Sequence, residues 1–266
     1  MKSQCRLFAD DALVYATRIQ SQQLQTDLNT LEKWAKTWQM NFNPKKKCFH
    51  LAVGKTALVG SSSPVFSICG QGLERVSSNP YLGVELQSDL KWNVHISQIE
   101  AKAKQKIGMI RRVLRDADLK TRMIAYTSLV RPGLEYGCAV WDPYFKNDIT
   151  VLERTQNLAL RFIFGIRGRV SFTELRKDKA IDTPKDRRTN IRMRLFDKIG
   201  KDVDIEIGVK VNVEAASLDN DKPPAQCTRF GQYYLPFIKT DQLLDSFLPC
   251  TVRDIRYGNR YTKYSS

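Results

Sequence analysis

The sequence predicts an α+β fold, with short strands in residues 1–92 and helices in most of the remainder. Two observations support this prediction. Up to about residue 86, apolar residues stand in short runs bounded by turn-forming residues, which is typical of strands. From residue 93 onward, apolar residues recur every three or four positions, which is typical of amphipathic helices.

Residues 5–16 predict two short strands joined by a tight turn. Leu7 and Val14 suit a buried sheet, whereas Asp10 and Asp11 interrupt the apolar run in its middle. Two-residue hairpin turns favour Asn-Gly or Asp-Gly rather than two acids. The Asp pair is therefore either an ordinary turn or a place where a divalent cation offsets the repulsion between the carboxylates.

A helix with one apolar face is predicted for residues 19–40, and Asn-Pro follows it. Trp34 and Trp38 are expected to anchor the core on this helix rather than to stack on bases. A strand at 48–53 and a hairpin at 65–76 are expected next.

Four helices are predicted in the second part of the chain from the period of their apolar residues. The second is expected to end before Pro132, because proline breaks a helix interior. Residues 201–228 have little periodicity and predict a linker. The four helical ranges are 94–115, 119–130, 149–164 and 185–199.

Positive charge is the strongest compositional feature. The 266 residues hold 43 Lys and Arg against 28 Asp and Glu, a net charge of +15. Residues 101–200 alone carry 23 basic and 11 acidic side chains, a net +12, and such a segment attracts polyanions such as nucleic acid.

Several classes of protein are not favoured by the composition. No run approaches the roughly 18 apolar residues of a membrane span, and acids near the N-terminus interrupt any signal-peptide core. The six cysteines are far apart and there are only two histidines, both expected to be structural. This argues against a zinc module and favours a reducing intracellular compartment.

A set of motifs, in order along the chain, resembles the non-LTR (LINE-type) retrotransposon reverse transcriptases. Phe8-Ala9-Asp10-Asp11 resembles their catalytic box. YLGV at 81–84 is similar to their primer-grip turn. Further matches are L-x-x-W-x-x-x-W-x-M-x-F-N-P-x-K at 31–46, and the segments 128–143, 152–165 and 235–255.

The resemblance implies a set of site residues. Asp10 and Asp11 would be catalytic ligands of Mg²⁺, with Mn²⁺ as an alternative, in nucleotidyl transfer. Either Lys46 or Lys47 would be the basic residue that assists pyrophosphate departure. The primer grip would be Tyr81, Leu82 and Gly83, where the glycine permits a tight turn.

The resemblance also implies partners: dNTPs, an RNA template and a DNA primer or target, with no membrane. Target-primed insertion would place the protein in the nucleus. Basic residues of the predicted thumb helix would track phosphates, with a solvated helix face as the alternative interpretation. These residues are Lys102, Lys104, Lys106, Arg111, Arg112 and Arg115.

The family pattern implies four parts: a partial palm at 1–92, a helical thumb at 93–145, a basic helical region at 146–200, and a linker and tail at 201–266. In the family, the fingers and a strand bearing another metal-binding Asp precede the catalytic box. The chain is therefore expected to be a C-terminal portion that is inactive alone. Its oligomeric state is open.

Two further interpretations remain beside the polymerase. One is a non-catalytic basic helical module that clamps a nucleic-acid backbone through residues 102–115 and 185–198. The other is a decayed element fragment without function.

Overall fold

The computed structural model of the protein describes residues 3–16, 21–54, 65–201, 228–230 and 233–235. The chain divides into two compact units, Met1–His95 (unit 1) and Ile96–Ser266 (unit 2). Strands dominate the first and helices the second, so the predicted α+β fold class is confirmed. The predicted linker and tail lie almost wholly outside the described residues.

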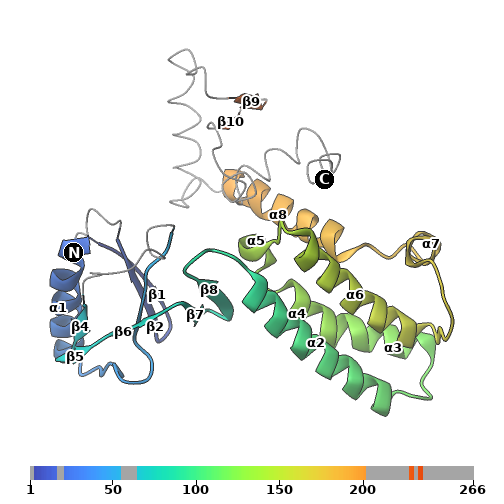
Figure 1. The fold of residues 1–266 in the computed structure, drawn as a ribbon, viewed down its shortest axis with the longest axis horizontal. Coiled ribbons are helices and arrows are strands. Elements are labelled where there is room, and N and C mark those ends of the chain that lie inside the picture. The colour runs from blue at the N-terminus through green and yellow to red at the C-terminus, as the bar shows by residue number, and fades with distance from the viewer. Residues whose placement is uncertain (1–2, 17–20, 55–64, 202–227, 231–232, 236–266) are drawn as a thin grey trace. The chain divides into compact units, whose positions relative to one another are not determined.

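Unit 1 is built from short paired strands and one helix (Figure 1). β1 (Gln4–Phe8) and β2 (Asp11–Tyr15) form the antiparallel hairpin that the sequence predicts, with Phe8 opposite Asp11. The other strands are β3 (Phe49–Leu51), β4 (Ser67–Ile68), β5 (Gln71–Gly72), β6 (Glu74–Val76), β7 (Ser78–Tyr81) and β8 (Val84–Gln87).

Helix α1 (Ser21–Thr37) packs on β4 through both apolar and polar contacts. Leu28, Leu31 and Ala35 are buried on its apolar face. The Gln25 side chain binds the backbone of Ser67 twice: its Nε2 donates to the carbonyl, and its Oε1 accepts from the amide, both at 2.8 Å. The Gln25 side chain thus makes with Ser67 of β4 the two backbone hydrogen bonds that a neighbouring strand would otherwise make.

The region predicted as one hairpin at 65–76 is more complex. The turn closes at Cys69 and Gly70, which have φ of 52° and 72°, and β4 pairs with β5. β6 leaves this hairpin and pairs in parallel with β3. The prediction was wrong about β6, because the pairing partner of so short a strand is chosen by contacts distant in the sequence.

Unit 2 is helical in all its described elements apart from β9 (Thr228–Phe230) and β10 (Tyr233–Leu235), which pair with each other (Figure 1). None of the described helices is long and apolar enough to cross a membrane. The helices are α2 (Asn93–Val113), α3 (Leu119–Ala125), the π-helix η3 (Tyr126–Val130), α4 (Arg131–Glu135), α5 (Cys138–Trp141), α6 (Lys146–Ile163), α7 (Phe172–Asp178) and α8 (Pro184–Lys201).

The helix that begins at Leu119 does not end before Pro132, which corrects the prediction. The chain widens into η3, where the Arg131 amide donates to the Tyr126 carbonyl, and then continues as α4. Pro132 stands in the first turn of α4, where proline is tolerated because its missing N–H has no helical partner. Helix α7, which had no periodic signal, is capped by Ser171.

The core of unit 2 follows the apolar face of α2. Successive turns of this helix bury an isoleucine or alanine against the neighbouring helices. Trp141 at the end of α5 is fully buried, and its Nε1 donates to the Tyr136 carbonyl at 2.8 Å. The buried apolar residues of α2 and α6 are Ile96, Ile99, Ala103, Ile107, Ile110, Leu152, Ala159, Leu160 and Ile163.

Three arginines of α8 are bound to acids on the α4–α5 segment. Arg188 and Arg192 are almost fully buried and share the carboxylate of Asp142; the Arg188 Nε lies 2.7 Å from Oδ1. Arg187 forms a two-pronged ion pair with Glu135, at 2.5 and 3.0 Å. These contacts fix α8 against α4 and α5, because a buried guanidinium needs a charged partner.

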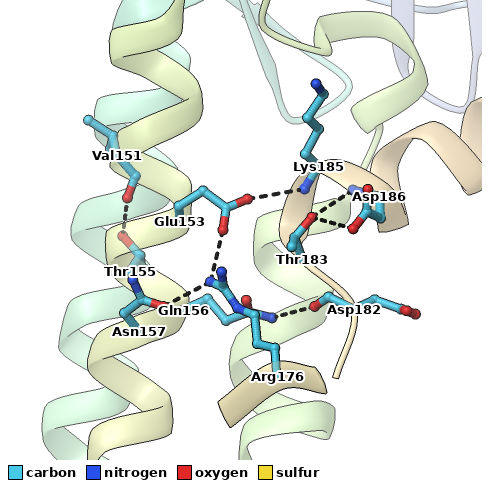
Figure 2. A network of polar contacts seen from close by, with 10 residues as sticks. All are labelled: Val151, Glu153, Thr155, Gln156, Asn157, Arg176, Asp182, Thr183, Lys185 and Asp186. Carbon is cyan, nitrogen blue, oxygen red and sulfur yellow. Dashed lines mark hydrogen bonds and ion pairs between the residues drawn. The ribbon is translucent and has the colours of Figure 1, made fainter. Parts of the chain in front are cut away.

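A second polar network joins α6 to α7 and to the start of α8 (Figure 2). The Glu153 carboxylate accepts from the Arg176 guanidinium at 2.8 Å and from the Lys185 amide at 3.4 Å. The Gln156 side chain donates to the Asp182 carbonyl at 3.1 Å. Side chains of α6 thus hold the irregular 179–183 connection, in addition to its backbone hydrogen bonds to the end of α7.

Arg122 joins the C-terminal ends of two helices. Its guanidinium donates to the carbonyls of Leu114, Arg115 and Phe162, at 3.3, 2.6 and 3.3 Å. It also lies 5.0 Å from the centre of the Phe162 ring. A cation at this position satisfies helix-end carbonyls and complements the negative ends of the helix dipoles of α2 and α6.

We expect Asp142→Ala to lower the free energy of unfolding of unit 2 by about 3–5 kcal/mol, since it leaves two buried guanidinium groups without their carboxylate. Urea unfolding followed by helical circular dichroism measures the effect. The control is Asp178→Ala, which removes an exposed ion pair with Lys179 and should cost no more than about 1 kcal/mol. Equal losses would contradict the structural role of Asp142.

His50 of β3 lies edge-on to Phe66, with ring centres 4.8 Å apart. Burial, and next the charge of Arg75, lower the pKa of His50 below its usual value. The folded state therefore disfavours the protonated ring, while the unfolded chain binds the proton near pH 6.5.

Because the pKa of His50 is lower in the folded state, the free energy of unfolding should be highest above about pH 6.5 and should fall as the pH drops below it. The variant His50→Gln should show a smaller decrease between pH 7 and pH 5. Urea titrations at a series of pH values test this, and an identical pH dependence in both proteins would contradict it.

Candidate functional site

The predicted catalytic acids lie at the turn between β1 and β2. Ala9, with a φ of 51°, and Asp10 form the turn. Asp11 is the first residue of β2, opposite Phe8. Both carboxylates are exposed, which is what a pair needs if it is to meet a ligand from outside the hairpin.

The oxygens of Asp10 and Asp11 are of the type that Mg²⁺ prefers. A bound cation would also remove the electrostatic repulsion between these two adjacent carboxylates. Magnesium takes six oxygen ligands. Among the described residues no group of three or more His, Cys, Asp or Glu stands ready to hold a metal. The pair thus fits part of a magnesium site, and further donors would have to come from elsewhere.

The predicted primer-grip residues form the turn between β7 and β8. Leu82 and Gly83 have φ of 47° and 80°, which is the two-residue turn with two left-handed positions that suits the twist of a hairpin. The prediction that Gly83 permits a tight turn is confirmed. The positive φ of Leu82 is rare for a bulky side chain. Residues with such backbone conformations cluster at functional sites.

The β7–β8 hairpin is attached to the first turn of α2. The Glu85 amide donates to Nδ1 of the buried His95 at 3.3 Å, and the Val94 amide donates to the Gln87 side chain at 3.2 Å. These bonds hold residues 94 and 95 against the hairpin within unit 1. His95 is structural, as expected, since its ring accepts from a strand amide.

Lys46 lies in an exposed turn that follows α1. The amides of Lys46 and Lys47 both donate to the Asn43 carbonyl, at 3.4 and 3.0 Å. Their side chains form no ion pair with any residue that the structure describes. The structure thus leaves open whether Lys46 or Lys47 is the family's basic residue, and the role stays a prediction.

All six basic residues predicted on the thumb helix are exposed, but two of them are engaged. Lys104 pairs with Glu100 at 2.6 Å, one turn earlier. Lys106 donates to the Leu129 carbonyl of η3 at 2.9 Å. The four that have no such partner among the described residues are Lys102, Arg111, Arg112 and Arg115.

The basic helix at 185–198 differs from α2. Arg187, Arg188 and Arg192 are the three arginines held by Glu135 and Asp142, and the latter two are buried. Arg188 and Arg192 have almost no surface to offer a nucleic acid, and Arg187, with 26% of its side chain exposed, is engaged by Glu135. The interpretation that residues 185–198 clamp a nucleic-acid backbone is therefore wrong for these three of the six basic residues, which stabilise the helical unit instead.

Trp34 and Trp38 are not core anchors, which corrects the prediction. Their side chains are 42% and 66% exposed. They stand beside the buried face of α1 rather than within it. Helical spacing alone did not separate these positions, although the lysine-rich, acid-free composition of residues 33–47 was a signal of an exposed surface.

Cys138 has the environment of a structural thiol. It is buried in α5, and burial, with Asp142 as a smaller cause, raises its pKa to about 11. A thiol that remains protonated at neutral pH is a poor nucleophile. Cys138 therefore contributes to packing and not to the chemistry of a site.

Three curated proteins of Drosophila melanogaster are similar to this chain. The probable RNA-directed DNA polymerase from transposon X-element is 24% identical over 238 residues, 86% of this chain and 25% of that protein. The probable RNA-directed DNA polymerase from transposon BS is 28% identical over 202 residues, 72% of this chain and 22% of that protein.

The RNA-directed DNA polymerase from mobile element jockey is 23% identical over 179 residues, 66% of this chain and 19% of that protein. The chain thus spans about a quarter or less of the length of these relatives. No family model and no solved structure matches it. All three relatives are RNA-directed DNA polymerases of mobile elements, and they confirm that this chain resembles the reverse transcriptases of non-LTR retrotransposons.

Proposed function

We propose that this chain is part of an RNA-directed DNA polymerase of a non-LTR retrotransposon and contributes to Mg²⁺-dependent nucleotidyl transfer. The observation that carries the proposal is its similarity, over 66–86% of its length, to three such polymerases. The exposed turn at Asp10–Asp11 and the tight turn at Leu82–Gly83 support it, because the resemblance implies functional residues at both positions.

The residues divide the task between binding and chemistry. Asp10 and Asp11 would hold the metal, which activates the primer hydroxyl and stabilises the leaving pyrophosphate when it is bound. Lys46 or Lys47 would protonate or neutralise the pyrophosphate. The turn at Leu82 and Gly83 would place the end of the primer, and dNTPs, an RNA template and a DNA primer would be the partners.

Helix α2 would bind the duplex of template and primer through its backbone. Residues 102–115 contain six Lys and Arg and no acid, and four of these cations have no partner among the residues that the structure describes. Phosphate contacts of this kind position a duplex without reading its sequence. This feature also favours the second candidate function, a non-catalytic module that binds nucleic acid through α2.

A chimera tests the polymerase. We expect that the isolated chain does not extend a primer on RNA. The reason is that, among its described residues, only the carboxylates of Asp10 and Asp11 stand together as ligands for Mg²⁺, which takes six oxygen ligands. In the chimera, this chain replaces the aligned segment of the X-element polymerase. The resulting protein should incorporate dNTPs on an RNA template. Asp10→Asn in the chimera should lower the rate by about 100-fold or more, as loss of one electrostatic group in an active site does.

Incorporation that is insensitive to Asp10→Asn would contradict the role of the Asp turn. Incorporation by the isolated chain that Asp10→Asn abolishes would contradict the expectation that it is inactive alone. Circular dichroism of each protein checks that the substitution leaves the fold intact.

We expect the isolated chain to bind an RNA–DNA duplex with micromolar or weaker affinity that falls steeply with salt. The double variant Arg111→Ala/Arg115→Ala should reduce the slope of log affinity against log salt by about 1.8, since each neutralised phosphate contributes about 0.9. Fluorescence anisotropy with a labelled duplex measures the slope.

The matched control is Arg194→Ala/Lys198→Ala on α8, which removes the same charge from two exposed residues at the same spacing. It should change the slope by less than about half as much, because Asp197 and the acids that pair with the α8 arginines lower the local positive field. Equal effects of the two variants would show that binding follows net charge and not the surface of α2.

A further inference from the structure

The end of α1 and the turn after it form an exposed surface that combines aromatic rings with positive charge. Trp34 and Trp38 are four residues apart, a spacing that places side chains on the same side of a helix about 5–6 Å apart. Met40, directly after the helix, is 52% exposed. Large apolar side chains exposed together mark an interaction site more often than scattered ones.

The exposure of Trp34 and Trp38 does not result from poor packing of α1. Leu28, Leu31 and Ala35 bury the other side of the same turns, and Met40 is held in place by its amide, which donates to the Ala35 carbonyl at 2.8 Å. The helix is thus fully docked within unit 1, and the two indole rings stand beside the contact rather than in it.

Positive charge surrounds the rings. Residues 33–47 contain five lysines and no acid. Lys36 pairs with Glu32 at 2.8 Å on the other flank of α1. The side chains of Lys33, Lys45, Lys46 and Lys47 are exposed and form no hydrogen bond or ion pair with any residue that the structure describes.

The turn after α1 holds the last three lysines together. The Asn43 carbonyl accepts from two successive amides, those of Lys46 and Lys47, so three neighbouring ammonium groups leave one compact turn. The turn begins five residues after Trp38, which limits the separation to about 17 Å even for an extended chain. Rings and charges therefore lie within reach of one short polyanion.

We propose that Trp34 and Trp38, together with Lys33 and Lys45–Lys47, form a binding site for an unpaired nucleic-acid strand. The rings stack on bases and the lysines contact phosphates, the combination by which proteins bind single strands without reading sequence. A duplex does not suit the site, because its base faces are covered by their neighbours in the stack.

A protein partner fits the surface less well than a nucleic acid. Lysine is depleted from protein interfaces, and burying several ammonium groups without acids on this side would be costly. The site shares Lys46 and Lys47 with the proposed pyrophosphate role, but binding of an unpaired strand requires no catalysis and adds a ligand that the proposed polymerase function does not assign to this turn.

The test uses the full chain and four labelled probes: the 12-mers oligo(dT) and oligo(rU), and blunt 12-base-pair DNA and RNA–DNA duplexes. Fluorescence anisotropy gives the affinities. Quenching of tryptophan emission that is lost in the phenylalanine variant reports on the two rings, since Trp141 is buried and Trp92, which is half-buried, is present in both proteins. The variants are Trp34→Ala/Trp38→Ala and the conservative Trp34→Phe/Trp38→Phe.

The alanine variant should lose about tenfold or more in affinity for both single strands, the effect expected when stacking on one or more bases is removed. The phenylalanine variant should retain most of it, and duplex affinity should stay within about twofold. Lys45→Gln/Lys47→Gln should lower the salt slope for single strands. The matched control Leu7→Ala/Val53→Ala removes two exposed apolar side chains of unit 1 and should leave both affinities unchanged.

Three outcomes would overturn the proposal. One is single-strand affinity that is unchanged in the alanine variant. Another is an equal loss for single strands and duplexes. The third is a difference in sedimentation between the unaltered chain and the alanine variant when no nucleic acid is present. Such a difference would identify the surface as an interface between copies of the chain. The variant Asp10→Asn should bind oligo(dT) as the unaltered chain does, so failure of the polymerase proposal and failure of this one are distinguishable.

Discussion

The fold of the helical unit depends on how it offsets the mutual repulsion among its basic side chains. A segment of 100 residues with a net charge of +12 can fold compactly only if some of its cations are neutralised within the fold. Asp142 does this for two buried arginines of α8, and Glu135 does it for a third. The C-terminal carbonyls of α2 and α6 do the same for Arg122.

While these charges are satisfied inside the unit, other basic side chains lie exposed on its surface. Residues 102–115, on α2 and the turn after it, keep four cations without a partner among the described residues and contain no acid. Structural and surface arginines are thus chemically the same group in two different settings. The setting is decided by whether a carboxylate or a helix end lies within hydrogen-bonding distance.

Unit 1 depends on turns rather than on a large sheet. Its strands are two to five residues long, and several of its turns use left-handed positions, as at Ala9, Cys69 and Leu82. Polar side chains of α1 take the part of missing strand neighbours, as Gln25 does for Ser67. Such a scaffold leaves the Asp10–Asp11 turn and the rings of Trp34 and Trp38 exposed.

The amino-acid sequence by itself determined the division into a strand-rich first part and a helical second part, the hairpin around the Asp pair, the turn at Gly83 and the basic residues of 102–115. These are local properties, set by residue spacing and by conformational preferences within a few residues. The family resemblance, too, followed from short motifs such as the acids at 10–11 and the segment 31–46.

Only the tertiary structure decided which residues these local patterns bury. The pairing of β6 with β3, the passage of the helix through Pro132, and the exposure of Trp34 and Trp38 all depend on neighbours far away in the sequence. The same is true of Arg188, whose partner Asp142 is 46 residues distant. A sequence shows that a side chain is charged or aromatic, but the energetic cost of its burial is set by the group that meets it in space.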